Sequence, residues 1–171
     1  MRRRFDTDWL EGAHVAEANR RLAEWMELWR ENCPAPGVLP RTLRPFFASP
    51  LSRRASPAIT AIVDVSAEQW QDFRFLVCDG AAAADPPFRK SMMAVRLGNC
   101  KIGALSRVLR ADFTEAKTTR RPMFHRLLGT LRGSAHDYHR LMLPLSLAGT
   151  DVDCLVIVSE LSRDRPDAGN D

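Results

Sequence analysis

The chain has 171 residues, of which 45% are hydrophobic and 27% charged, and it carries a formal net charge of +4. This composition is ordinary for a soluble globular protein. A chain of this length forms one domain and buries roughly two thirds of the surface that its unfolded form exposes. No apolar run approaches the roughly 20 residues of a transmembrane helix, so the sequence predicts no membrane association.

The arginines are scattered in twos and threes and do not form a stripe along one helix, which indicates a solvated surface and no nucleic-acid partner. The cysteines contain no C-x-x-C pair, so they indicate reduced thiols and neither a disulfide framework nor a zinc site. They are Cys33, Cys78, Cys100 and Cys154. The start, MRRRF, is similar to a twin-arginine signal, but Asp6 and Asp8 interrupt the stretch that would have to be apolar. We therefore expect a cytoplasmic protein.

Residues 8–31 have the pattern of an amphipathic helix, with apolar side chains at steps of three and four. Asp8 and Glu11 resemble a capping box that opens the helix, and Pro34 ends it. The most apolar part of its face consists of Leu22, Trp25, Met26 and Trp29. This face could pack on the domain's own sheet or form a homodimer or partner interface, and the pattern leaves both open.

Six prolines in residues 34–57 forbid a long regular element and allow a short helix over 41–47. Residues 58–65 and 72–80 then have the β-branched and alternating character of strands. The link between them is short enough for an antiparallel hairpin. The segment therefore predicts a wrapping connection followed by the first two strands.

Residues 81–106 are irregular and weakly helical, and residues 108–119 form a better helix with one apolar side. Residues 123–133 are predicted to be a third strand, which leads into a hairpin over 136–161. In its first strand, leucines alternate at positions 141, 143, 145 and 147, so one side is apolar. The second strand, beginning at Val152, is apolar at nearly every position and should therefore be central in the sheet.

The order of these elements predicts an α+β fold, with the helices gathered on one face of a five-stranded antiparallel sheet and an additional N-terminal amphipathic helix. We expect an N-terminal helix and linker over 1–39, the sheet domain over 40–161, and a disordered polar tail over 162–171.

Three features of the sequence resemble PAS domains, and in particular the compact PAS-like proteins common in alphaproteobacteria. They are Trp29 with Pro40, the FRFLV…G strand of Phe73 to Gly80, and above all the hairpin of Tyr138 to Val158. The resemblance covers roughly residues 22–161. It implies a central strand flanked by the first and fourth strands, and a ligand pocket between the sheet and the helix near 108–119. It also implies signalling through small-molecule or partner binding, usually with dimerisation through the N-terminal helix.

The resemblance thus implies a stand-alone sensory domain whose pocket takes a small apolar metabolite. The expected pocket residues are Phe75, Val77, Leu109, Phe113, His139, Leu141 and Leu143. The chain has no room for a kinase, cyclase or DNA-binding output, so its signal would leave through a partner protein. The alternative is a ligand-free dimerisation or adaptor module with a filled core, which uses Leu22, Trp25, Met26 and Trp29 as its interface.

The resemblance to PAS domains raises flavin and haem as candidate cofactors. Cys100, in LGNCKIGAL, is similar to the cysteine of flavin photoreceptors, but the last strands lack the amide side chains that bind the ring. Haem needs an axial histidine, and His125 and His139 are the histidines that the strands offer near a pocket. His136 and His139 have odd spacing on a strand and point to opposite faces. We expect no cofactor and no metal, and without a recognised catalytic motif we expect no enzymatic activity.

Overall fold

The computed structural model of the chain describes residues 2–3, 15, 19–54, 57–78, 95–99, 104–131 and 134–161. These residues form a six-stranded sheet and three α-helices, with short 3-10 helices between them. The helices are α2 (Arg20–Glu31), α3 (Arg44–Ala48) and α4 (Ala104–Thr119). The strands are β1 (Arg2–Arg3), β2 (Ala58–Asp64), β3 (Arg74–Cys78), β4 (Met123–Leu131), β5 (Ser134–Leu145) and β6 (Cys154–Leu161).

All strand pairs are antiparallel, and the order across the sheet is β1-β4-β5-β6-β2-β3. Five long strands and the two-residue β1 therefore make up the sheet. As predicted, β6 is central and lies between β5 and β2. Its position follows from its sequence, because Leu155 and Ile157 are buried on one face while Cys154 and Val156 are buried on the other.

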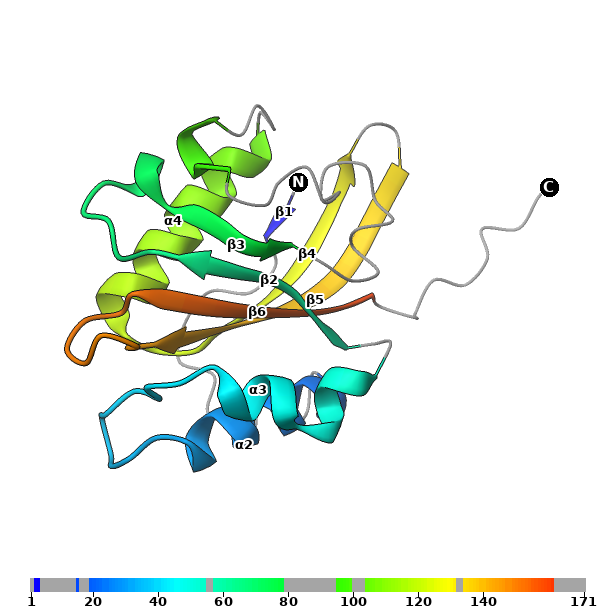
Figure 1. Ribbon diagram of the computed structural model, residues 1–171. Helices are drawn as coiled ribbons and strands as arrows, with labels where there is room; N and C mark the ends of the chain where they lie inside the picture. The colour runs from blue at the N-terminus through cyan, green and yellow to red at the C-terminus, as the bar shows by residue number, and fades with distance from the viewer. Residues whose placement is uncertain are drawn as a thin grey trace.

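The sheet separates two apolar cores (Figure 1). Helix α4 covers one face with Leu109 and Phe113, whereas α2 and α3 cover the opposite face with Trp25 and Phe46. The prediction placed the middle helices on one face, where α4 lies, and it did not include the cover that α3 gives to the opposite face. The physical reason is that β5 and β6 bury apolar side chains on both faces, so each face needs its own cover.

Helix α2 begins at Arg20, where Asn19 is the N-cap and its side chain accepts a hydrogen bond of 3.0 Å from the Leu22 amide. The predicted capping box at Asp8 lies outside the described residues. Leu22, Trp25 and Met26 are buried, since the apolar face of α2 packs on the chain's own sheet. Of the two alternatives left open by the sequence, the structure shows this one.

Helix α4 begins at Ala104, four residues before the predicted start, and ends at Thr119 as predicted. Arg120 follows in the left-handed region with φ 58°, and its amide donates to the Ala116 carbonyl at 3.1 Å. The edge strand β3 is partly covered, because the amide of Phe75 donates to Val95 and the amide of Leu97 donates to Phe73. Residues 81–94 and 162–171, for which irregular structure and a tail were predicted, lie outside the described part of the chain. Within that part, no helix is both long and apolar enough to cross a bilayer.

Candidate functional site

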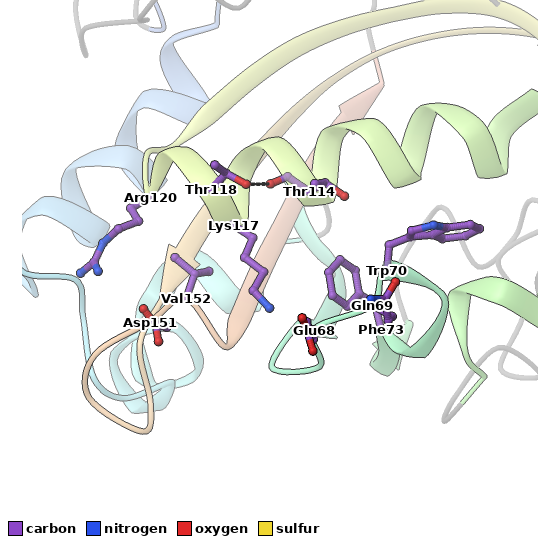
Figure 2. Close-up of a pocket in the computed structure, with 10 residues that line it drawn as sticks. All are labelled: Glu68, Gln69, Trp70, Phe73, Thr114, Lys117, Thr118, Arg120, Asp151 and Val152. Atoms are coloured by element: carbon purple, nitrogen blue, oxygen red, sulfur yellow. Dashed lines mark hydrogen bonds between the residues drawn. The ribbon is translucent and has the colours of Figure 1, made fainter.

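A pocket with a volume of about 400 Å³ lies at the C-terminal end of α4 (Figure 2). Its walls come from α4, from the connection between β2 and β3, and from the turn between β5 and β6. The lining residues are Glu68, Gln69, Trp70, Phe73, Thr114, Lys117, Thr118, Arg120, Asp151 and Val152. None of them was among the predicted site residues, because three segments distant in the sequence meet here.

Lys117 occupies the middle of the pocket, between its two rims (Figure 2). Its ammonium group donates to the carbonyl oxygens of Val65 and Ala67, both at 2.7 Å, and lies 5.4 Å from the centroid of the Phe73 ring. No carboxylate in the described part of the chain lies within ion-pair distance of it. The ammonium is therefore held in place by backbone carbonyls, without an ion pair among the described residues.

The rims of the pocket carry charges of both signs. Arg120 donates to the Thr150 carbonyl at 2.8 Å, and Glu68 and Asp151 are exposed carboxylates with no ion pair among the described residues. Trp70 is half-buried, and the guanidinium carbon of Arg110 lies 4.8 Å from its ring centroid. The pocket thus combines an aromatic wall with two cationic and two anionic side chains.

A second polar feature is buried between α4 and the sheet. Asp112 of α4, His125 of β4 and Arg140 of β5 are 0%, 0% and 3% exposed, and His125 and Arg140 are direct neighbours in the register of the two strands. Arg140 Nη2 donates to Asp112 Oδ2 and lies 3.0 Å from His125 Nδ1. Burying an ion pair costs desolvation energy, so this cluster stays stable only while its partners remain together. It ties α4 to the β4–β5 hairpin.

Three of the predicted pocket residues do lie together on the α4 face. Phe75, Leu109 and Phe113 belong to one buried core, and the rings of Phe75 and Phe113 pack edge to face with centroids 6.2 Å apart. Val77 is on the same strand as Phe75, but its side chain lies outside what the structure describes. These two large rings therefore fill the space between β3 and α4 where they meet.

The structure corrects the placement of the other three, Leu141, Leu143 and His139. Leu141 and Leu143 are buried in the core on the α2 side, and the His139 ring stacks on Phe124 with centroids 5.4 Å apart. Because successive residues of a strand point to opposite faces, it is Met142 that faces α4. The predicted set therefore does not line one pocket.

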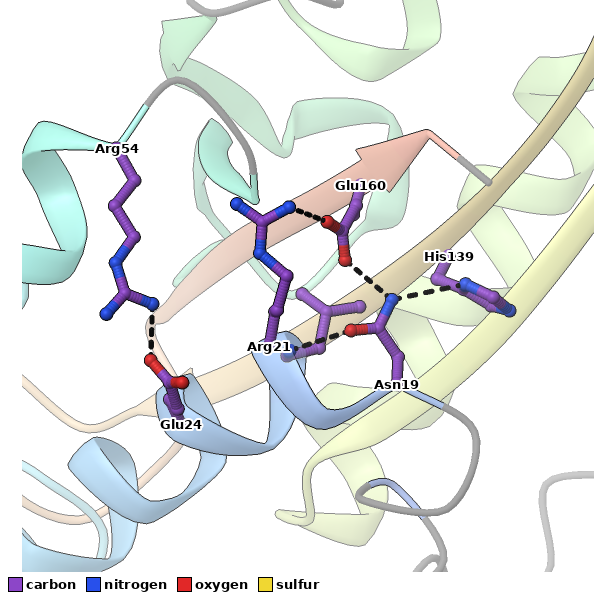
Figure 3. Close-up of polar contacts among 7 residues, drawn as sticks. Asn19, Arg21, Glu24, Arg54, His139 and Glu160 are labelled. Atoms are coloured by element: carbon purple, nitrogen blue, oxygen red, sulfur yellow. Dashed lines mark hydrogen bonds and ion pairs between the residues drawn. The ribbon is translucent and has the colours of Figure 1, made fainter. Parts of the chain in front are cut away.

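A third polar cluster joins the start of α2 to the sheet (Figure 3). Asn19 Nδ2 donates to Glu160 Oε2 at 2.7 Å and lies 3.3 Å from His139 Nδ1, while Arg21 pairs with Glu160 Oε1 at 2.7 Å. On the same helix, Trp29 donates its indole N–H to the Pro144 carbonyl at 2.8 Å. The residues predicted as a dimer interface are thus engaged by the chain's own sheet, with Leu22, Trp25 and Met26 buried and Trp29 half-buried.

The groups examined for cofactor binding are not gathered at one site. Cys100 lies outside the described residues, and His125 and His139 face opposite sides of the sheet. Burial, with smaller contributions from Asp153 and Asp64, raises the pKa of the Cys154 thiol to about 12. Burial also raises the pKa of Cys33. Among the residues that the structure describes, no group of three or more His, Cys, Asp or Glu side chains could hold a metal ion.

Comparison with protein-family models, with curated proteins and with solved structures gave no match. The fold and these three polar features are therefore the basis for proposing a function.

Proposed function

We propose that the chain is a sensory domain of the PAS type, which binds a small molecule on the α4 side of its sheet and signals through a partner protein. The observation that carries this proposal is the strand order. Counted along the chain, the five long strands lie in the order third, fourth, fifth, first, second, so the fifth is flanked by the first and fourth. This is the arrangement that the PAS resemblance implies.

The position of α4 supports the same function. It is the described helix between the second and third long strands, and it covers one face of the sheet with Leu109 and Phe113. Polar contacts hold it at two places, through Asp112 to Arg140 and through Lys117 to the β2–β3 connection. A molecule that binds beside α4 would contact the groups that hold this helix to the sheet, which gives binding a structural consequence. We assign no catalytic step to this face.

A ligand-free adaptor is the second candidate, and one observation favours it. Phe75 and Phe113 are both buried and pack against each other on the α4 side of the sheet. An adaptor would also need a contact surface other than Leu22, Trp25 and Met26, since these side chains are buried within the chain.

The two candidates differ in whether the purified protein carries a small molecule. We expect its mass under native conditions to exceed the denatured mass by that of a ligand, and an absorption scan of the same sample would detect a chromophore. Phe113→Ala should weaken retention of a ligand that contacts the apolar part of the face. An empty protein that also binds no added compound would contradict the sensory function and favour the adaptor.

A further inference from the structure

We infer that the pocket at the C-terminal end of α4 binds a small zwitterion of the α-amino acid class. Its carboxylate would face Lys117, its ammonium would face Glu68 or Asp151, and its side chain would lie against Phe73. The inference rests on the proposed function, because it names the pocket and the ligand class that the sensor would use.

The size and the apolar wall of the pocket suit such a ligand. A volume of about 400 Å³ is within the range of small-molecule sites and accommodates an amino acid with a large side chain. Phe73 and Val152 are buried, and Trp70 is half-buried at one rim (Figure 2). Phe73 and Val152 line the pocket with little of their surface exposed, and together with Trp70 they make its wall partly apolar, which an inorganic ion would leave unused.

The positive side of the site is fixed before a ligand arrives. The ammonium of Lys117 has three N–H donors, and two of them bind the carbonyls of Val65 and Ala67. The third remains for a ligand, and the position of the donor is already set, which lowers the entropic cost of binding. Arg120 adds a second cation at the rim. Its backbone is left-handed, with φ 58°, a conformation that glycine usually adopts at the end of a helix.

The negative side decides the class of ligand. Glu68 and Asp151 lie on opposite sides of Lys117 in Figure 2, and both are exposed without an ion pair among the described residues. With Lys117 and Arg120 they bring the charge of the lining to zero. A simple anion would be attracted by two side chains and repelled by two others, and the same holds for a simple cation. A molecule that carries both charges can satisfy both pairs.

The test begins with isothermal titration of the purified protein with each of the twenty standard L-amino acids. At least one should bind saturably, with a Kd below about 10 mM. The best binder is then compared with its N-acetyl form, which has no ammonium, and with its methyl ester, which has no carboxylate. Each derivative should bind about tenfold more weakly or worse.

Two variants connect the binding to the pocket. Glu68→Gln and Asp151→Asn change exposed side chains that make no hydrogen bond or ion pair among the described residues, so both should fold. At least one of them should weaken binding of the amino acid about tenfold and leave binding of its N-acetyl form unchanged. Glu31→Gln, an exposed carboxylate on α2, is the matched control and should change neither. Lys117→Met is a poorer test, because it also removes two backbone hydrogen bonds.

The inference is overturned if no amino acid binds, if the N-acetyl form binds equally well, or if neither acidic variant affects binding. An apolar compound that binds the wild-type protein and not Phe113→Ala, in the absence of amino-acid binding, would leave the sensory function standing and reject the zwitterion. If no compound of either kind binds, both proposals fail.

Discussion

Replacing Arg140 by methionine should destabilise the fold more than the loss of a surface ion pair would. The guanidinium is 3% exposed and donates to Asp112, whose side chain is fully buried. Methionine keeps most of the aliphatic stem, but it leaves the Asp112 carboxylate without this cation in a low-dielectric environment. Removing one partner of a buried pair costs about 3–5 kcal/mol in the free energy of unfolding. For a domain of this size the Tm should fall by about 6–20 °C.

The double variant Asp112→Leu/Arg140→Met distinguishes a buried pair from a simple loss of packing. Replacing both partners by apolar side chains of similar volume is often neutral or stabilising, so the double variant should be more stable than Arg140→Met alone. Urea unfolding followed by circular dichroism gives the free energies for the cycle. Arg41→Met, which changes an exposed arginine, is the control and should stay within about 0.5 kcal/mol of the wild type. The reasoning is refuted if Arg140→Met lowers the free energy of unfolding by less than about 1 kcal/mol, or if the separate effects of Asp112→Leu and Arg140→Met simply add in the double variant.

Three further predictions follow from other contacts. Asn19→Asp keeps a good N-cap but places a second carboxylate beside Glu160. Its free energy of unfolding, measured by urea titration, should fall by about 1 kcal/mol at pH 7 and recover near pH 4, where carboxylates become protonated. Asn19→Ser should show no such recovery. Cys154, with its pKa raised from 9.0 to about 12, should resist iodoacetamide at pH 8 until urea unfolds the protein, as followed by site-resolved mass spectrometry. Its contribution to stability should be present below pH 9.0 and fall as the pH rises toward 12. Rapid labelling of the folded protein would contradict this prediction. Trp25→Ala should lower the free energy of unfolding by about 3–5 kcal/mol without changing the mass measured by light scattering. The control Phe47→Ala, at a side chain that is 51% exposed, should lower it by about 0.5 kcal/mol or less. A lower mass for Trp25→Ala would mean that α2 carries a dimer interface.

The strands were the part of the fold that the sequence predicted best. Alternating leucines and a β-branched run identified β5 and β6, and the absence of a polar face on β6 placed it at the centre, where the structure has it. Periodicity also located α2 and α4, while their starts moved to Arg20 and Ala104. Helix ends depend on caps, and the sequence analysis took Asp8 as the cap and did not identify Asn19.

The faces of the strands could not be predicted in the same way. Leu141 and Met142 are both fully buried, so the apolar pattern of β5 does not say which of them faces α4. The choice depends on how β5 pairs with β4 and on which helix covers each side, and these are long-range contacts. For the same reason the pattern assigned Asp112 and Arg140 no buried role, because charged residues are rarely buried unless they find a partner across the core.

The pocket was missed because it depends on tertiary contacts alone. Trp70, Lys117 and Asp151 come from three separate segments, and none of them belongs to a motif with a fixed spacing. The only local signal was Lys117 itself, which lies four residues after Phe113 and so falls on the buried side of an amphipathic helix. A charged residue at such a position indicates a specific polar partner, and here the partners are the carbonyls of Val65 and Ala67.

The consecutive residues His139 and Arg140 give β5 a property that neither face has alone. One side chain contacts Asn19 at the start of α2, and the other contacts Asp112 of α4, on the far side of the sheet. A single peptide unit thus joins polar contacts to both helical layers. A rotation of that unit that moves the guanidinium relative to α4 also moves the imidazole beside Asn19, so a backbone change here reaches both layers at once.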